Sequence, residues 1–475
     1  MNHTHDYDAL VVGSGPNGLA AAITMAREGC TVLLLEIKDT VGGGMRSEEL
    51  TLPGFVHDVC SAIHPLAVAS PFFKELKLDQ KDLQWIYPPA ALAHPLGDGK
   101  AALLRKSIDA TAQTLGVDKK VYAELMYRLT GTMDGALNDL LGPLRIPKHP
   151  LATLQFGWRG LLPAATFARR WFHGDLAQGL FAGISAHAIA PLEHWTTAAF
   201  GLLLGTAGHL NGWPLVKGGS QKLADLLATE LVSLGGTIET SVTVTTLDQL
   251  PKARVVLFDL SPRQLDTIAA DRLPGSYRKC LQSHQHGPGA FKIDWALDGP
   301  IPWKAQACLE AGTVHVGGTL SEIADSEQDV WKGKHPELPF VLVVQQSLFD
   351  PSRVPEGKQS AWGYCHVPNG SSVDMGERIE NQIERFAPGF RERILARAVI
   401  NPQGMEDYNP NYIGGDIAGG ALNPWSLFVR PLGQWKPYAT PLKGIYLCSA
   451  STPPGGGVHG MCGYHAARMA IRENL

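Results

Sequence analysis

The sequence has few charged residues for its length and no long run of either sign. Asp, Glu, Lys and Arg make up 18% of its 475 residues, and 41 basic against 45 acidic side chains leave a net charge of −4. This balance does not predict a surface for a phosphate backbone, so we expect no nucleic-acid partner. Hydrophobic residues reach 44%, enough for a buried interior, and this excludes a mainly disordered chain.

Long hydrophobic runs and paired cysteines are also missing. No apolar run approaches the roughly 18 residues that a membrane-spanning helix needs, and the stretch from Met1 to Asp6 has neither the basic nor the apolar part of a secretory leader. The seven cysteines are an odd number, lie far apart and show no C-x-x-C pair or zinc-ligand spacing. We therefore expect a cytoplasmic protein with reduced thiols, no metal site and no thiol–disulfide exchange.

Glycine, in contrast, is abundant, with 52 residues, and it separates strand-like from helix-like segments. Residues 9–12 and 31–35 are short apolar strands, and residues 19–28 between them are rich in helix formers, which predicts a β-α-β unit. Residues 110–210 are mostly helical in pattern, and alternating runs beyond residue 289 predict a mostly antiparallel sheet. Further segments indicate a helix at 221–234 and strands at 237–247 and 255–259.

The turn after the first strand fits the G-x-G-x-x-G fingerprint of dinucleotide-binding proteins. It reads Gly13-Ser14-Gly15-Pro16-Asn17-Gly18. Its glycines allow a diphosphate to approach the helix N-terminus, where unpaired N–H groups favour negative charge. Glu36 ends the second strand, where a carboxylate accepts hydrogen bonds from a ribose hydroxyl. An ordinary glycine turn before a buried helix is the alternative.

NAD and FAD both satisfy this fingerprint, and a second glycine run bears on the choice. Gly42, Gly43 and Gly44 are followed by Met45 and Arg46. A flexible backbone and a guanidinium at this place can reach a longer dinucleotide. A surface loop with a solvated arginine is the alternative.

A third glycine run lies near the other end of the sequence, between a short strand at 444–448 and a helix at about 461–473. It reads Ser451-Thr452-Pro453-Pro454-Gly455-Gly456-Gly457-Val458-His459-Gly460. A flavin ring needs N–H donors of this kind, because negative charge collects on its acceptors when it is reduced. We therefore predict FAD as the cofactor, with a loop that only caps the last helix as the alternative.

These motifs resemble those of the phytoene-dehydrogenase-like flavoproteins, a family that includes bacterial carotenoid desaturases and retinol-saturase-type enzymes. The resemblance spans nearly the whole chain. It rests on the first turn with Glu36, on Gly42-Gly43-x-x-Arg46, on Gly54-Phe55-x-x-Asp58 and on Thr452-x-Pro454-Gly455-x-Gly457-Val458-x-Gly460.

The resemblance implies an α/β fold in which a doubly wound, Rossmann-like FAD-binding domain of the glutathione-reductase or amine-oxidase type is interleaved with an α+β substrate domain. The FAD-binding domain is expected to comprise residues 1–75, 213–288 and 436–475. The substrate domain is expected to comprise residues 76–212 and 289–435. Val244 is similar in place to a residue whose backbone contacts the adenine. The expected cofactor contacts are Gly13, Ser14, Gly15, Pro16, Asn17, Gly18, Glu36, Ile37, Lys38, Gly43, Gly44, Met45, Arg46, Val244, Pro454, Gly455, Gly456, Gly457 and Val458.

Two departures from the carotenoid desaturases fall where the family's residues approach the flavin ring. Cys60-Ser61, followed by His64, stands where Gly-Pro is common, and His459 stands where Pro is often found. These polar groups argue against a narrow slot for a long polyene. Because imidazole titrates near neutrality, His64 and His459 are the candidate proton donors or acceptors, with hydrogen-bonded packing as the alternative.

The helical segment carries aromatic side chains that can line a lipophilic pocket, rest on a membrane surface or pack in the core. They are Trp158, Trp171, Trp195 and Phe200. Three further histidines in apolar helical stretches are expected to be satisfied core residues. They are His187, His209 and His465.

We expect an FAD-dependent oxidoreductase that removes hydride from, or adds it to, a carbon–carbon bond of a small, lipophilic substrate. One alternative is an FAD-dependent amine oxidase, although Cys448-Ser449 stands where such enzymes usually show Gly-Glu. The others are a redox-neutral double-bond isomerase that needs reduced flavin, and a flavin-binding protein that acts only by interaction. Peripheral membrane contact and a homo-oligomer are further possibilities for its partners.

Overall fold

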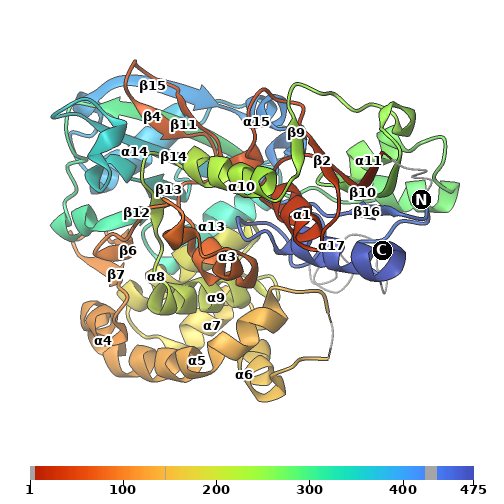
Figure 1. Cartoon of the computed structure of the whole chain (residues 1–475). Helices are drawn as coiled ribbons and strands as arrows, with labels where there is room; N and C mark the ends of the chain where they lie inside the picture. Colours follow the sequence, from red (N-terminus) through yellow and green to blue (C-terminus); the bar gives the residue numbers. More distant parts are fainter. Residues whose placement is uncertain (1–5, 145, 423–435) are drawn as a thin grey trace.

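Strands β1 (Tyr7–Val12) and β2 (Val32–Leu35) pair side by side, as the β-α-β pattern predicts. The structure, a computed structural model, describes residues 6–144, 146–422 and 436–475. The two strands belong to a sheet of order β16-β10-β1-β2-β9 in which every pairing is parallel (Figure 1). Its other strands are β9 (Thr237–Glu239), β10 (Ala253–Phe258) and β16 (Ile445–Leu447). The expected α/β fold class, with its Rossmann-like parallel sheet, is confirmed.

Helix α1 (Pro16–Arg27) packs against both α10 (Gln221–Ser233) and the closing helix α17 (Met461–Asn474). In Figure 1, α1 and α17 lie beside each other, which brings the two ends of the sequence together. Their approach is so close that a Cβ on Gly463 would overlap the backbone carbonyl of Asn17. Glycine therefore allows the last helix to lie against the start of the first.

A second sheet has the order β15-β11-β14-β13-β12-β6-β7. All of its pairings are antiparallel except the one between β6 and β12, in agreement with the expected, mostly antiparallel sheet. Its strands are β6 (Ala90–Pro95), β7 (Ala101–Leu104), β11 (Gly289–Leu297), β12 (Ala311–Val316), β13 (Val341–Val344), β14 (Gln359–Val367) and β15 (Ile394–Ile400).

The two faces of this second sheet differ in chemistry, because side chains alternate along each strand. One face carries apolar residues such as Phe291 and Val343 and forms a core with α14 (Gly376–Phe386). The opposite face is polar and aromatic. Its residues on β11, β12 and β14 are Lys292, Asp294, Thr313, His315, Trp362, Tyr364 and His366. A buried polar face of this kind must be satisfied by partners or serve a site.

Residues 110–210, expected to be mostly helical, are so in the described structure. The helices of this segment are α4 (Ile108–Ala112), α5 (Lys119–Leu140), α6 (Pro150–Gly160), α7 (Ala164–Trp171), α8 (Asp175–Ser185) and α9 (Thr197–Leu210). The remaining helices are α2 (Pro65–Ala69), α3 (Pro71–Leu76), α11 (Pro262–Ile268), α12 (Gly275–Gln282), α13 (Leu320–Trp331) and α15 (Pro402–Tyr408). Two short strand pairs complete the described strands: β3 (Ser47–Glu49) with β4 (Val56–Asp58), and β5 (Trp85–Ile86) with β8 (Leu215–Val216).

The expected strand at 237–247 is much shorter in the structure, where only β9 is extended in a sheet. Ser241 has a φ of 59°, and its N–H donates to the carbonyl of Lys38 at 2.8 Å. The N–H of Val242 donates to the carbonyl of Glu36 at 2.9 Å. The chain therefore turns across the end of β2 instead of continuing along it.

The strands of the five-stranded and the seven-stranded sheet fall within the segments assigned to the FAD-binding and the substrate domain, but the domain boundaries themselves stay a prediction. Residues 1–5 and 423–435, which that assignment includes, lie outside the described residues. Within the part of the chain that the structure describes, no helix combines the length and apolar character needed to cross a membrane.

Candidate functional site

A cavity of about 1180 Å³ is lined by both the turn between β1 and α1 and the turn between β16 and α17. Two turns more than four hundred positions apart in the sequence thus share one space. From them the cavity extends to side chains of α6 and α9 and to the polar face of the second sheet, where Trp362 and Tyr364 line it. This arrangement joins a dinucleotide-type turn to an apolar compartment.

The first turn owes its shape to its glycines. Gly13 has a φ of 98°, and its N–H donates to the carbonyl of Leu35 at 2.8 Å. A Cβ on Gly18 would overlap the Gly13 carbonyl, so α1 could not begin so close to the strand with any other residue. The second glycine run packs against this turn, because a Cβ on Gly43 would lie 2.8 Å from the Cα of Gly15.

Glu36 and Arg46 hold these loops together. The carboxylate of Glu36 accepts hydrogen bonds from the Ser14 N–H at 2.9 Å, the Ser14 hydroxyl at 2.5 Å and the Lys38 N–H at 2.9 Å, and pairs with Arg46 at 3.1 Å. Arg46 is buried and also donates to the carbonyls of Thr40 and Gly43. A ribose hydroxyl that binds Glu36 would therefore either form an additional hydrogen bond or replace the one from the Ser14 hydroxyl. Arg46 is a buried clamp, not a solvated loop residue.

His459 lies within the turn between β16 and α17 and is almost fully buried. Its Nδ1 accepts a hydrogen bond from the Met461 N–H at 3.0 Å, so Nε2 carries the proton, which it donates to the carbonyl of Gly455 at 3.1 Å. Burial lowers the pKa of His459 to about 4, which keeps the ring neutral. With both nitrogens engaged inside the turn, the structure favours hydrogen-bonded packing, the alternative expected for His459. A proton-carrying role for this residue stays a prediction.

His64 differs, because one of its nitrogens is free. The Ser220 hydroxyl donates to the carbonyl of Ser61 at 2.6 Å, so it must accept from His64 Nε2, which lies 2.9 Å away. The lone pair is then on Nδ1, which has no partner among the described residues. Burial lowers the pKa of His64 to about 4. His64 thus stays a candidate for proton chemistry as a neutral acceptor.

The cavity gathers nearly all of the expected site residues. They are Gly13, Ser14, Gly15, Pro16, Asn17, Glu36, Ile37, Lys38, Gly43, Gly44, Arg46, His64, Val244, Pro454, Gly455, Gly456, Gly457, Val458 and His459. The other two expected contacts, Gly18 and Met45, are not among the described residues that line the cavity. Gly18 lies behind the turn, where its N–H donates to Asp259, and Met45 is fully buried in the hydrophobic core.

Sequence reasoning missed several residues that line the cavity. Asp259 follows β10, and its Oδ2 accepts from the Gly18 N–H at 2.9 Å. Burial and the nearby Glu36 raise the pKa of Asp259 to about 7. Its place at the end of the predicted strand 255–259 was the available signal, because strand ends in such sheets border ligand sites. His187, expected in the core, also faces the cavity, whereas His209 is bonded to Tyr122 as a core residue would be.

The residues present fit a flavin dinucleotide. The N-terminus of α1 lines the cavity, and the buried Oδ1 of Asn17 has no partner among the described residues. Lys38 and Arg263 add positive charge on this side. The volume is above the roughly 300–1,000 Å³ of common ligand pockets, which leaves room for a cofactor and a substrate together.

Solved structures share this architecture over nearly the whole chain. An oxidoreductase from Methanosarcina mazei superposes with a TM-score of 0.67 at 15% identity, covering 98% of this chain and 99% of that one. A putrescine oxidase with bound putrescine gives 0.62 at 17%, covering 98% of both chains. Cyclohexylamine oxidase from Brevibacterium oxydans gives 0.61 at 15%, covering 98% and 99%. The fold is that of the FAD-dependent oxidoreductases of the amine-oxidase type.

Sequence comparison adds homologues within this class. The family described as an NAD(P)-binding Rossmann-like domain matches residues 11–76. Pyridine nucleotide-disulfide oxidoreductase domain-containing protein 2 of Rattus norvegicus is 25% identical, covering 98% of this chain and 94% of its own length. A limonene dehydrogenase subunit of Castellaniella defragrans is 22% identical, covering 100% and 96%. A neurosporene-forming phytoene desaturase of Rhodobacter capsulatus is 24% identical, covering 96% and 92%. The homologues of this chain thus include phytoene desaturases and a component of limonene dehydrogenase, and its class is that of FAD-dependent oxidoreductases.

Proposed function

We propose that this protein binds FAD between its two glycine turns and catalyses hydride transfer at a carbon–carbon bond of a small, largely apolar molecule. The observation that carries the proposal is the cavity that unites both turns with the apolar helical layer. When bound, FAD supplies the two-electron donor or acceptor. The relatives named for phytoene and limonene, both hydrocarbons, support an apolar substrate.

Different residues of the chain would bind the cofactor, bury the substrate and accept a proton. The first turn, with Glu36 and Arg46, would hold the adenosine and diphosphate, and the turn around Gly456 would place N–H donors beside the flavin ring. Apolar side chains of α6 and α9, among them Phe156 and Phe200, would bury the substrate and exclude water. His64 would accept a proton at Nδ1, the nitrogen that keeps its lone pair.

Flavin loading and reduction test this proposal. We expect the purified protein to be yellow, or to become so with FAD, and its flavin absorbance to bleach anaerobically with a suitable apolar donor. Exchange of Gly456 for Val should weaken FAD binding, because a side chain there would press on the Ala418 carbonyl, 2.8 Å from the Cβ position. Gly97→Val, at a glycine with open space around its Cβ position, is the matched control. A protein that cannot be reconstituted with FAD contradicts the proposal.

An FAD-dependent amine oxidase is the second candidate, and the putrescine and cyclohexylamine oxidase structures favour it. Trp362 and Tyr364, stacked with ring centroids 5.9 Å apart, supply aromatic walls. Peroxide formation with a panel of amines, and none with apolar hydrocarbons, would establish this activity. Products at the same oxidation level as the substrate would instead indicate an isomerase, and flavin that no donor reduces would indicate a binding protein.

A further inference from the structure

The cavity wall at the second sheet carries Thr313, Trp362 and Tyr364 beside apolar residues such as Leu342, and His187 of the helical segment lies at the same cavity. Leu342 of β13 pairs in register with Tyr364 of β14 on one side and with His315 of β12 on the other, so all three side chains project from the same face. His315 Nε2 lies 3.2 Å from Nε2 of His187, which lines the cavity. The Tyr364 phenol and the His187 imidazole thus flank Leu342.

The hydrogen bonds of His315 determine where His187 carries its proton. His315 is fully buried, and its Nδ1 has no partner among the described residues. An orphaned buried N–H is rarer than an orphaned acceptor, so the His315 proton belongs on Nε2, where it is donated to His187 Nε2. His187 must then carry its own proton on Nδ1. The ring contacts His315 through Nε2 and lines the cavity, so we infer that its Nδ1–H donor is directed to the cavity.

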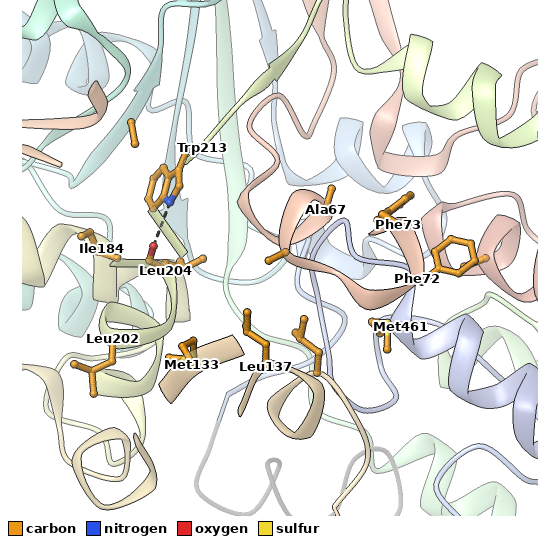
Figure 2. Close-up of a cluster of buried hydrophobic side chains, with 14 of the residues drawn as sticks. Ala67, Phe72, Phe73, Met133, Leu137, Ile184, Leu202, Leu204, Trp213 and Met461 are labelled. Atoms are coloured by element: carbon orange, nitrogen blue, oxygen red, sulfur yellow. Dashed lines mark hydrogen bonds between the residues drawn. The ribbon is translucent and has the colours of Figure 1, made fainter. Parts of the chain in front are cut away.

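The ring of His187 is held in place by His315 on one side and by Trp213 on the other. Trp213 packs edge-on against it, with ring centroids 5.8 Å apart, and the Trp213 N–H donates to the Leu204 carbonyl at 3.2 Å (Figure 2). Figure 2 shows Trp213 above Leu204, with Met133 and Leu137 of α5 lower in the view. A fixed ring makes the direction of its N–H donor specific.

The described residues of this wall present no unpaired charge to the cavity. Burial lowers the pKa of His187 to about 4, so the imidazole is uncharged near neutrality. Lys292, on the same face of the sheet, is buried and paired with Asp294. The described cations that line the cavity, Lys38, Arg46 and Arg263, follow strands β2 and β10 of the other sheet. A carboxylate at this wall would have no partner, whereas a neutral oxygen would gain a donor.

We propose that the substrate carries a neutral, hydrogen-bond-accepting oxygen, of the carbonyl type, on an otherwise apolar body, and that His187 with Tyr364 binds this oxygen. The proposal rests on the proposed function, because it assigns the orientation of the substrate within the same cavity. His187 and Tyr364 are specificity residues in this scheme. They position the apolar body relative to the cofactor and exclude anionic analogues.

The test compares probes of one carbon skeleton in the FAD-loaded protein: limonene, carvone and perillic acid, which differ in having no oxygen, a ketone and a carboxylate. Isothermal titration calorimetry should give about five- to tenfold tighter binding of carvone than of limonene, the advantage of one or two net hydrogen bonds. Perillic acid should bind more weakly than carvone. The infrared carbonyl stretch of bound carvone should fall below its value in an apolar solvent.

Variants connect these effects to the two residues. His187→Phe and Tyr364→Phe should each reduce the preference for carvone over limonene, and His187→Gln, which keeps a donor, should retain part of it. Tyr127→Phe, at an exposed tyrosine bonded to Asp109, is the control and should leave all affinities unchanged. The infrared measurement on the unmodified protein needs no variant, so it decides the question even where His187→Phe fails to fold.

The outcomes separate this inference from the proposed function. If FAD binds but carvone and limonene bind equally, with an unshifted carbonyl stretch, the inference is overturned and the proposed function stands. Tighter binding of perillic acid than of carvone overturns it as well. If the protein takes up no FAD, the proposed function fails and this inference fails with it.

Discussion

Asp259 places a carboxyl group directly behind the turn that is expected to hold the diphosphate. It is buried, accepts the Gly18 N–H at 2.9 Å, and its pKa is raised to about 7 by burial and by Glu36. Its ionised form would repel a diphosphate, and a bound diphosphate would raise this pKa further. The raised pKa favours the protonated carboxyl group in the FAD complex. FAD binding therefore takes up a proton, and the affinity for FAD falls as the pH rises through 7.

We therefore expect the dissociation constant of FAD to increase about tenfold between about pH 6 and pH 8, the change for one coupled proton. Asp259→Asn should remove this dependence and bind FAD more tightly at the higher pH. Fluorescence quenching of FAD measures both constants. Asp266→Asn, at a carboxylate paired with Arg278 outside the cavity lining, should keep the unmodified pH dependence. An Asp259→Asn protein with the same pH dependence as the unmodified one would show that this acid does not titrate with binding.

At the level of elements, the turn between β16 and α17 depends on His459 as a structural part. It satisfies the Met461 N–H and the Gly455 carbonyl, while its own carbonyl accepts the Ser70 hydroxyl at 2.6 Å. We expect His459→Ala to lower the free energy of unfolding by about 1–3 kcal/mol, the effect of leaving buried groups unpaired, and to weaken FAD binding. His459→Asn should lose less, because its amide oxygen can accept the Met461 N–H.

Urea unfolding at neutral pH measures this loss, with His149→Ala, at an exposed histidine, as the control. If His459→Ala is as stable as the unmodified protein, the turn does not need these bonds. A changed pH dependence of flavin reduction in a stable His459→Asn protein would instead show that His459 carries a proton during the reaction.

How far the sequence predicts these elements depends on whether the cause is local. The turns at Gly13 and Gly456 and the β-α-β unit follow from glycines and short-range patterns, so they could be predicted. The early end of β9 could not be predicted. It depends on the turn at Ser241, where the N–H groups of Ser241 and Val242 donate to carbonyls of residues that follow β2. The roles of His187 and Tyr364 depend on strand register and helix packing between segments far apart in sequence, for which a single sequence gives little signal.

At the scale of the whole molecule, an exposed apolar surface lies beside the mouth of the cavity. Figure 1 shows α5, α6 and α7 together at one end of the molecule. Leu151, Leu154 and Trp158 of α6 are 76%, 65% and 46% exposed, and Leu144 and Leu161 are exposed while also lining the cavity. Arg159 stacks over Trp158 at 4.2 Å, which adds a cation to the apolar face. Apolar and cationic groups in this combination are typical of surfaces that rest on anionic lipid.

We therefore expect the protein to sediment with phosphatidylcholine vesicles that contain about 30 mol% phosphatidylglycerol, and less with phosphatidylcholine alone, because basic residues contribute about 1 kcal/mol each near an anionic surface. Leu151→Glu combined with Leu154→Glu should abolish sedimentation without changing FAD binding, because neither residue lines the cavity. Val117→Glu, at an apolar residue that is 79% exposed outside this surface, should sediment normally. A self-associating protein whose dimer is lost in the double variant, and which never binds vesicles, would identify a second copy as the partner of this face.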